Sequence, residues 1–332
     1  MKLLSYICAC VVWSGSAIAL PLGSASALTD TRAPLEGFVE VNHVQLEYLD
    51  WGGAGPSLIL IHGLADTAHV FDDIAPAFTD AFHVIAYTRR GSIGSEIKGP
   101  YDLATLTEDL RGLMDALGIA KADLIGLSAG GDEVTQMAAT YPDRVRHVVY
   151  LDAAYDWASP MFQAAVQALP IGFFDPPASA LASLNAYRAY QQATIYPSLD
   201  AMQRVEANLR QKVVVQTDRS VRVRMSKDTV AALYAAVFTN QRRDYSEIHC
   251  PTLAVYAEHL YDWNIADVKH RRELINYEKQ YWTPFQASST EHLRRSLASA
   301  QIHHVNAAHS SLILTHRQQV VAMMRKFLLA PH

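Results

Sequence analysis

The chain has 332 residues, of which 50% are hydrophobic and 18% charged, and its formal net charge at pH 7 is −5. This composition excludes a disordered protein, because half of the residues are available to build a core. The mild acidity, with arginines scattered in short pairs rather than gathered in a stripe, disfavours nucleic acid as a partner.

The first 27 residues have the order of a secretory signal peptide. One lysine precedes an apolar stretch from Leu3 to about Leu20, and small residues follow it. The apolar stretch is shorter than the roughly 20 residues that a membrane-spanning helix needs. We therefore predict a secreted or periplasmic protein, cleaved after Ala27 or after Ala19, that keeps no membrane segment.

The cysteines place a further limit on the exported chain. Cys8 and Cys10 lie inside the predicted leader and would leave with it, so that Cys250 would be the only cysteine left. An intrachain disulfide is then impossible. We expect the exported chain to be held together by its hydrophobic core.

The first predicted elements are the two strands of a hairpin. Residues 38–53 alternate apolar and polar side chains on either side of Asn42-His43, which is the pattern of paired strands around a tight turn. Short apolar runs then recur along the chain, as expected of buried strands. They cover residues 57–61, 82–87, 122–127, 145–151, 251–257 and 300–305.

Helical patterns separate these apolar runs. Residues 103–118 repeat leucine and methionine at helical spacing, a second helix runs from Gly130 to just before Pro142, and a third covers 317–330. Buried strands that alternate with helices predict an α/β fold, with a doubly wound, mostly parallel sheet and helices on both faces.

Between residues 155 and 246 the alternation of strands and helices stops. This stretch combines helical segments with prolines, among them those at 160, 170, 176 and 177, and we interpret it as a helical cap over one edge of the sheet. The predicted organisation has four parts in chain order. It comprises a signal peptide at 1–27, the first part of the core at 28–154, the cap at 155–246 and the second part of the core at 247–332, which includes a helical piece at 267–282.

A candidate nucleophile lies in the sequence Gly126-Leu127-Ser128-Ala129-Gly130. A serine between two glycines can be an ordinary small residue of a tight turn. Here a predicted strand precedes it and a predicted helix follows it, which is the context of a nucleophile elbow. The sharp turn needs flanking positions almost without side chains, and the helix N-terminus supplies amide donors for an oxyanion.

A candidate general base is His309. It follows the last predicted strand and precedes the last helix, and so lies at the carboxyl edge of the sheet, where catalytic groups of open α/β folds gather. His316 is its nearest rival, but it belongs to the entry of the helix. The other histidines have positions typical of structural residues.

The remaining parts of a catalytic site can be assigned from position. Glu258, Asp262 and Asp267 follow the strand at 251–257. Asp262 is the preferred acid, since it lies a few residues past the strand end and completes the expected order of nucleophile, acid and base. The backbone N–H groups of Leu64, after the strand at 57–61, and of Ala129 are the predicted oxyanion donors.

Taken together, these segments resemble the α/β-hydrolase superfamily, and in particular its cap-bearing, esterase-like members. The resemblance covers nearly all of the chain after the leader. It rests on five motifs in family order, "HGLADT", "YTRRGSIGS", "GLSAGG", "PTLAVYAEHLYD" and "NAAHSS". It implies that Ser128 is the nucleophile, His309 the base, and Leu64 with Ala129 the oxyanion donors.

Three positions depart from the pattern of that family. Leu127 replaces a frequent histidine, and Thr88 replaces a frequent aspartate in a loop that we interpret as structural. Asp262 is displaced from the usual spacing of the acid. Some relatives carry the acid after the preceding strand, so Asp152 and Glu258 remain alternative acids.

Neither a cofactor nor a metal is predicted. No G-x-G-x-x-G follows the first strand of the chain, which disfavours a dinucleotide-dependent oxidoreductase. His303-His304 lacks a third ligand at zinc-like spacing.

The expected function is that of a secreted serine hydrolase, which cleaves a carboxylic ester or similar acyl bond of a small-molecule substrate. Lactonases, peptidases, perhydrolases and C–C hydrolases share this triad and stay as alternatives. Dehalogenases and epoxide hydrolases of the superfamily use aspartate at the elbow and are disfavoured by Ser128. A binding protein without turnover is the alternative of another class. The aromatic composition of the cap suggests a partly apolar substrate.

Overall fold

The computed structural model of the chain describes residues 33–169, 176–239 and 243–331. The predicted signal peptide and its cleavage site lie outside these residues. Within the described ranges, no helix combines the length and the apolar composition needed to cross a membrane.

Eight strands form one sheet, in the order β1-β2-β4-β3-β5-β6-β9-β10. The pairings β1–β2 and β2–β4 are antiparallel, and the other five are parallel. The strands are β1 (Leu35–Val41), β2 (Val44–Gly52), β3 (Ser57–Ile61), β4 (His83–Tyr87), β5 (Ala122–Leu127), β6 (Val145–Leu151), β9 (Thr252–His259) and β10 (Gln301–Ala308). The prediction of a mostly parallel, doubly wound sheet is confirmed.

The helices and helical turns of the core connect these strands. They are η1 (Ala68–Phe71), η2 (Ala75–Phe78), α1 (Leu103–Ala116), α2 (Gly130–Thr140), η3 (Pro142–Arg144), α3 (Pro160–Gln167), α7 (Val268–Tyr277), the π-helical turn η5 (Glu278–Trp282), α8 (Thr283–Ser296), α9 (Leu312–Thr315) and α10 (Arg317–Leu328).

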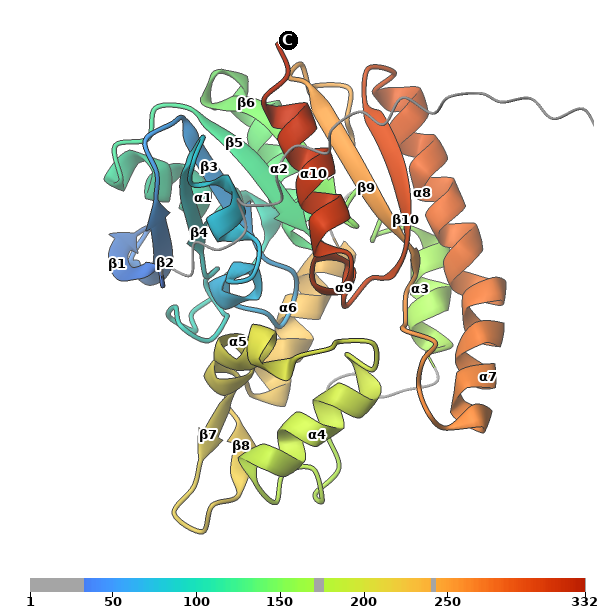
Figure 1. Cartoon of the computed structure of the whole chain (residues 1–332). Helices are drawn as coiled ribbons and strands as arrows, with labels where there is room; N and C mark the ends of the chain where they lie inside the picture. Colours follow the sequence, from blue (N-terminus) through green and yellow to red (C-terminus); the bar gives the residue numbers. More distant parts are fainter. Residues whose placement is uncertain (1–32, 170–175, 240–242, 332) are drawn as a thin grey trace, which may run out of the picture.

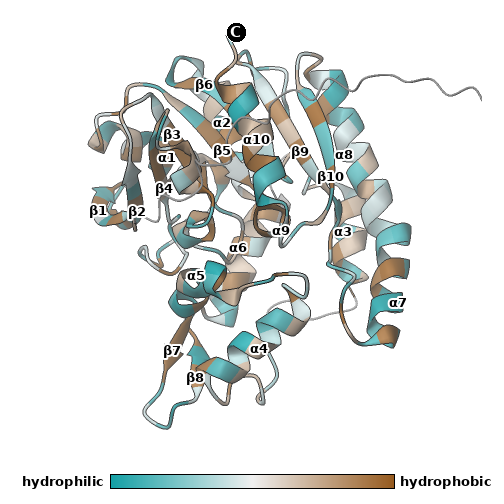
Figure 2. Ribbon diagram, in the orientation of Figure 1, coloured by the Kyte–Doolittle hydropathy of each residue, from teal (hydrophilic) through white to brown (hydrophobic). Residues whose placement is uncertain are grey.

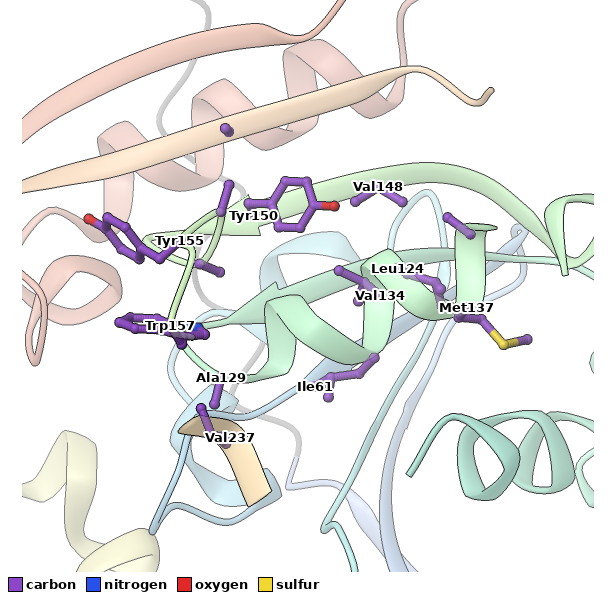
Figure 3. Close-up of a cluster of buried hydrophobic side chains, with 14 of the residues drawn as sticks. Ile61, Leu124, Ala129, Val134, Met137, Val148, Tyr150, Tyr155, Trp157 and Val237 are labelled. Atoms are coloured by element: carbon purple, nitrogen blue, oxygen red, sulfur yellow. The ribbon is translucent and has the colours of Figure 1, made fainter. Parts of the chain in front are cut away.

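Two apolar clusters cover the two faces of the sheet, because successive strand residues point to opposite sides. In β3, Ile59 and Ile61 belong to the cluster shared with α1, α2 and α8, whereas Leu58 and Leu60 belong to the cluster shared with α10. Figure 3 shows part of the first cluster. In Figure 2 the sheet carries hydrophobic segments, while outer helices such as α7 present both hydrophilic and hydrophobic residues.

The predicted hairpin at the start of the sheet is confirmed. β1 pairs with β2 in antiparallel register, and Val41 faces Val44 across the turn. Asn42 and His43 both have positive φ, 49° and 62°. Two consecutive left-handed residues form the tight turn that matches the twist of paired strands.

The segment expected to form the cap has two parts. Its first helix, α3, packs against η5 and α8 beside the sheet. The later elements gather beyond the carboxyl ends of the strands (Figure 1). These elements are α4 (Leu184–Thr194), η4 (Met202–Val205), α5 (Glu206–Gln211), β7 (Val213–Val215), β8 (Val221–Val223) and α6 (Lys227–Thr239). Below, the cap means these six elements and the loops between them.

The small β7–β8 sheet was not expected from the sequence. Its strands have three residues each and pair in antiparallel register. Runs of this length carry too little alternation to be distinguished from loop.

Candidate active site

Ser128 lies on a sharp turn between β5 and α2, and its φ is 51°. The two flanking glycines are required by space. A Cβ atom on Gly126 would lie 2.6 Å from the carbonyl oxygen of Gly130, and one on Gly130 would lie 2.3 Å from that of Ile61. Because real Cβ atoms do not approach backbone oxygens this closely, the spacing of the motif follows from the turn itself.

His309 contacts the serine from the loop after β10. Its Nε2 lies 3.0 Å from Ser128 Oγ, within hydrogen-bond distance. Its backbone N–H donates to the carbonyl of His259 at 2.7 Å, which ties the start of this loop to the end of β9. The Trp282 ring packs edge-on against the imidazole, with the ring centroids 6.1 Å apart.

Asp152, directly after β6, is the carboxylate that faces His309. Its Oδ2 lies 2.5 Å from His309 Nδ1, and its side chain is fully buried. The contact requires the proton of the neutral imidazole to be on Nδ1, which leaves Nε2 free to accept the serine proton. Ser128, His309 and Asp152 therefore form one hydrogen-bonded chain.

Two donors hold the other carboxylate oxygen of Asp152. The backbone N–H of Ala257 donates to Oδ1 at 2.9 Å, and the Tyr155 hydroxyl donates to the same oxygen. Burial and the neighbouring carboxylate raise the pKa of Tyr155 well above its ordinary value, so this hydroxyl keeps its proton. Gln286 donates in turn to Tyr155 and to the Ala257 carbonyl.

The preference for Asp262 as the partner of His309 has to be corrected. Asp262 accepts hydrogen bonds from the backbone N–H groups of Ser198 and Asn264, each at 3.0 Å, and its carboxylate faces the cap. Glu258 is exposed on β9. The alternative Asp152 occupies the position because β6 lies between β5 and β9, so that its end is next to the elbow.

The predicted oxyanion donors lie beside the serine. Ala129 caps the N-terminus of α2, and the Cβ atom that Gly63 lacks would lie 3.0 Å from Ser128 Cβ. Neither the N–H of Leu64 nor that of Ala129 is engaged in a hydrogen bond with another described residue. Both donors are thus available to a ligand at the serine.

His62 orients the peptide that carries the Leu64 donor. Its Nδ1 donates to the Gly63 carbonyl at 2.7 Å, and its Nε2 accepts the Arg89 N–H at 3.1 Å. Burial, and secondarily Arg89, lower the pKa of His62 to about 3, so the ring is neutral. In a trans peptide the N–H points away from the C=O. Fixing the Gly63 carbonyl on His62 therefore turns the Leu64 N–H the other way.

Buried ion pairs hold the N-terminal turn of α2, which follows Ser128. Arg89 pairs with Glu133 of α2 at 2.9 Å, and Arg243 pairs with Asp132. Burial raises the pKa of Glu133 to about 7 although Arg89 opposes that effect. Arg90 donates to Asp109 at 2.7 Å. The contacts of Arg89 and Arg90 agree with a structural role for the loop that carries them.

No group of three or more histidine, cysteine, aspartate or glutamate side chains is placed to hold a metal in the part of the chain that the structure describes. His303 and His304 are exposed on β10, the last strand of the sheet.

Several supporting residues were missed by sequence reasoning. Tyr155 and Gln286 hold the acid, and Glu278 holds the loop after β9 by accepting from the N–H of Tyr261 at 2.8 Å and from the Trp263 indole at 2.9 Å. Tyr155 follows Asp152 closely in the sequence and could have been noticed. Gln286 lies in α8, 131 residues from Tyr155, and Glu278 lies in η5, and no local signal marks either of them.

Comparison with known proteins identifies the family of the chain. The model of the alpha/beta hydrolase fold family matches residues 56–259. Epoxide hydrolase A of Mycobacterium tuberculosis is 37% identical over 124 residues, which cover 36% of this chain and 38% of that protein. The chain spans less than half the length of the curated relatives it matches first.

Two solved structures cover about nine-tenths of the chain. The structure of E-2-(acetamidomethylene)succinate hydrolase superposes with a TM-score of 0.69 and 19% identity, covering 90% of this chain and 100% of that one. The enol-lactonase of Burkholderia xenovorans superposes with a TM-score of 0.59 and 26% identity, covering 89% and 100%.

Proposed function

Because the chain belongs to the alpha/beta hydrolase fold family, we propose that it is a serine hydrolase that cleaves a carboxylic ester or a similar acyl bond. The observation that carries this proposal is the hydrogen-bonded chain from Ser128 through His309 to Asp152. A serine activated by a histidine, which is itself oriented by a buried carboxylate, is the arrangement of acyl transfer.

In the proposed reaction, His309 Nε2 takes the proton of Ser128 as Oγ attacks the substrate carbonyl. The C=O bond becomes a single bond, and its oxygen carries the negative charge between the N–H groups of Leu64 and Ala129. Asp152 stabilises the imidazolium that forms. The intermediate collapses to an acyl-enzyme while His309 gives its proton to the leaving group. Water, deprotonated by His309, then attacks the acyl carbonyl, and the carboxylic acid product leaves as Ser128 regains its proton.

The chemistry of serine favours acyl substrates over epoxides and haloalkanes. An aspartate nucleophile that opens an epoxide forms an ester, which water can cleave at the carboxylate carbon. Ser128 in the same role would form an ether, which has no carbonyl for water to attack. For this reason the activity of a relative named as an epoxide hydrolase is not transferred to this chain.

The substrate that we propose is a small, partly apolar ester. Lactones fall within this class, since a lactone is an internal ester and passes through the same intermediate. The alternative of a binding protein without turnover was favoured in the sequence by the displaced position of Asp262. It is weaker now, because Asp152 provides a carboxylate in contact with His309. We also propose export of the protein, on the basis of residues 1–27, which N-terminal sequencing of the secreted protein would test.

The experiment combines a fluorophosphonate probe with p-nitrophenyl esters of increasing chain length. We expect the probe to label Ser128, as located by mass mapping, and short or medium esters to be hydrolysed. The matched variant Ser128→Ala should lose labelling and about 10⁴-fold or more in kcat while its melting temperature stays near that of the wild type. A folded wild-type protein that is neither labelled nor active would support the binding-protein alternative.

A further inference from the structure

A buried asparagine of the cap contacts the loop that follows β3. Asn208 of α5 is 0% exposed. Its Oδ1 accepts from the Thr67 hydroxyl at 3.2 Å, and its Nδ2 donates to Asp66 Oδ1 at 3.1 Å. Both partners belong to residues 62–67, called here the oxyanion loop, which also carries the Leu64 N–H.

A charged contact reinforces this attachment. Lys212, which follows α5, donates from Nζ to Asp66 Oδ1 at 2.5 Å. Burial would raise the pKa of Asp66, but Lys212 and the Asn208 hydrogen bond together outweigh it and hold that pKa below its ordinary value. Burial would likewise lower the pKa of Lys212, and Asp66 reverses the shift. Both groups are therefore charged at neutral pH.

The oxyanion loop needs support at this point because its backbone is strained. Ala65, between the donor and Asp66, has φ of 59°, a left-handed conformation that costs a non-glycine residue energy. Such a conformation persists only where the surroundings hold it. The core holds the first end of the loop through the Arg89 N–H, which donates to His62, and the last end through the N–H of His69, which donates to Thr67. The described side-chain contacts of Asp66 come from the cap.

We propose that Asn208 and Lys212 are positioning residues, which hold the Leu64 N–H in place for the oxyanion, so that the cap takes part in forming the oxyanion hole. This inference rests on the proposed function. Loss of the contacts would lower the rate of acylation and leave the binding of the substrate nearly unchanged, because neither side chain has to touch the substrate to act. An oxyanion donor contributes to the transition state rather than to the ground state.

The test uses Asn208→Ala, Lys212→Met and Lys212→Arg in the full chain. The three measurements are the rate of fluorophosphonate labelling, kcat and KM on a p-nitrophenyl ester, and the inhibition constant of phenylboronic acid. The boronic acid forms a tetrahedral adduct with Ser128 and places an oxygen where the oxyanion would lie. Rates are normalised to the concentration of active sites, so that loss of folded protein is not counted as loss of activity.

We expect Asn208→Ala to lower kcat and the labelling rate by about 10- to 100-fold, part of the effect of losing one oxyanion donor. Boronic acid inhibition should weaken by a similar factor, while KM changes less than about threefold. Lys212→Met should show the same pattern more weakly. Lys212→Arg should be close to the wild type, because it keeps the charge beside Asp66.

Asp262→Ala is the matched control. Asp262 also joins the core to the cap, through the N–H of Ser198, but at a loop remote in sequence from residues 62–67. It should leave all three measurements within about twofold of the wild type. An equal loss in Asp262→Ala would mean that any loosening of the cap lowers the rate, and would overturn the specific role of Asn208.

Further outcomes separate this inference from the proposed function. If the wild type is labelled, two results for Asn208→Ala would overturn the inference and leave the serine hydrolase standing. One is a labelling rate and kcat within twofold of the wild type, and the other is a raised KM with no change in kcat. Failure of the wild type to react would overturn the proposed function first. If Asn208→Ala does not fold, Lys212→Met decides, since that side chain is 21% exposed and its replacement leaves no buried cavity.

Discussion

Two loops approach His309, one after β6 and one after β9, and they support it in different ways. The β6 loop contacts the imidazole ring, through the buried carboxylate of Asp152. The β9 side contacts the backbone of His309, through the carbonyl of His259 at the end of the strand, which accepts the His309 N–H at 2.7 Å. The carboxylate of the β9 loop, Asp262, faces the cap instead.

The difference lies in what each carboxylate has as neighbours. Asp152 is enclosed, with Tyr155 and the Ala257 N–H on one oxygen and His309 on the other. Asp262 accepts from backbone N–H groups in a loop that is partly open to solvent. A carboxylate stabilises a forming imidazolium most strongly where water is excluded and the dielectric is low. Burial and orientation, rather than distance along the chain from a strand end, distinguish the two acids.

The largest expected effect comes from removing the charge of the β6 loop. Asp152→Asn should keep the shape of the site but lower kcat by about 10⁴-fold, because the amide cannot stabilise the imidazolium and favours the wrong tautomer of His309. Steady-state kinetics on a p-nitrophenyl ester measure this. Activity within tenfold of the wild type would show that a different group orients the histidine.

A smaller effect on kcat is expected from removing the Tyr155 hydroxyl that supports Asp152. Tyr155→Phe removes one hydrogen bond to the buried carboxylate, of a kind that contributes about 1.5–3 kcal/mol. We expect kcat to fall about tenfold, with part of the loss appearing as a lower melting temperature. If kcat is unchanged and only the stability falls, the hydroxyl supports the fold and not the acid.

The β9 loop should respond more weakly, through Glu278. Glu278→Gln keeps an acceptor for the Tyr261 N–H but loses the charge beside His259, at 3.3 Å from its ring. We expect kcat to fall by only about threefold, since His309 would keep Asp152. A loss as large as that of Asp152→Asn would contradict the comparison of the two loops.

We also expect Glu278→Gln to change how the free energy of unfolding depends on pH. Burial raises the pKa of Glu278 above its ordinary value of 4.5. The folded protein therefore holds this proton in a pH range where the unfolded chain has lost it, so Glu278 makes the free energy of unfolding fall as pH rises from 4.5 through the raised pKa. In Glu278→Gln this part of the decline should disappear. Chemical denaturation at several pH values would measure it, and identical slopes in both proteins would count against the shift.

The smallest effect is expected for Asp262. Asp262→Ala should change kcat less than about twofold, because the carboxylate contacts the cap and not His309. Comparison with Asp152→Asn on the same ester is the direct measurement. A loss of about 10⁴-fold, as large as that of Asp152→Asn, would restore Asp262 as the acid.

Much of the fold could be predicted from local patterns. The runs that form β3 and β5 are mostly apolar, and the segment of α1 has helical periodicity, so each is marked by its own residues. The serine and the histidine of the site could also be found, because each lies at the junction of a predicted strand and a predicted helix. The three-residue strands β7 and β8 could not, since they are too short for a periodic signal.

By itself, the sequence determined the type and order of the strands of the main sheet and of the helices between them, and it marked Ser128 and His309 as the candidate nucleophile and base, because these depend on neighbours in the chain. Only the tertiary structure decided which acid meets the base and which cap residues reach the oxyanion loop. Asp152 and His309 are 157 residues apart, and Asn208 and Asp66 are 142 apart. The physical reason is that contacts of this range depend on the order of strands in the sheet and on where the cap packs, and no local periodicity encodes either of them.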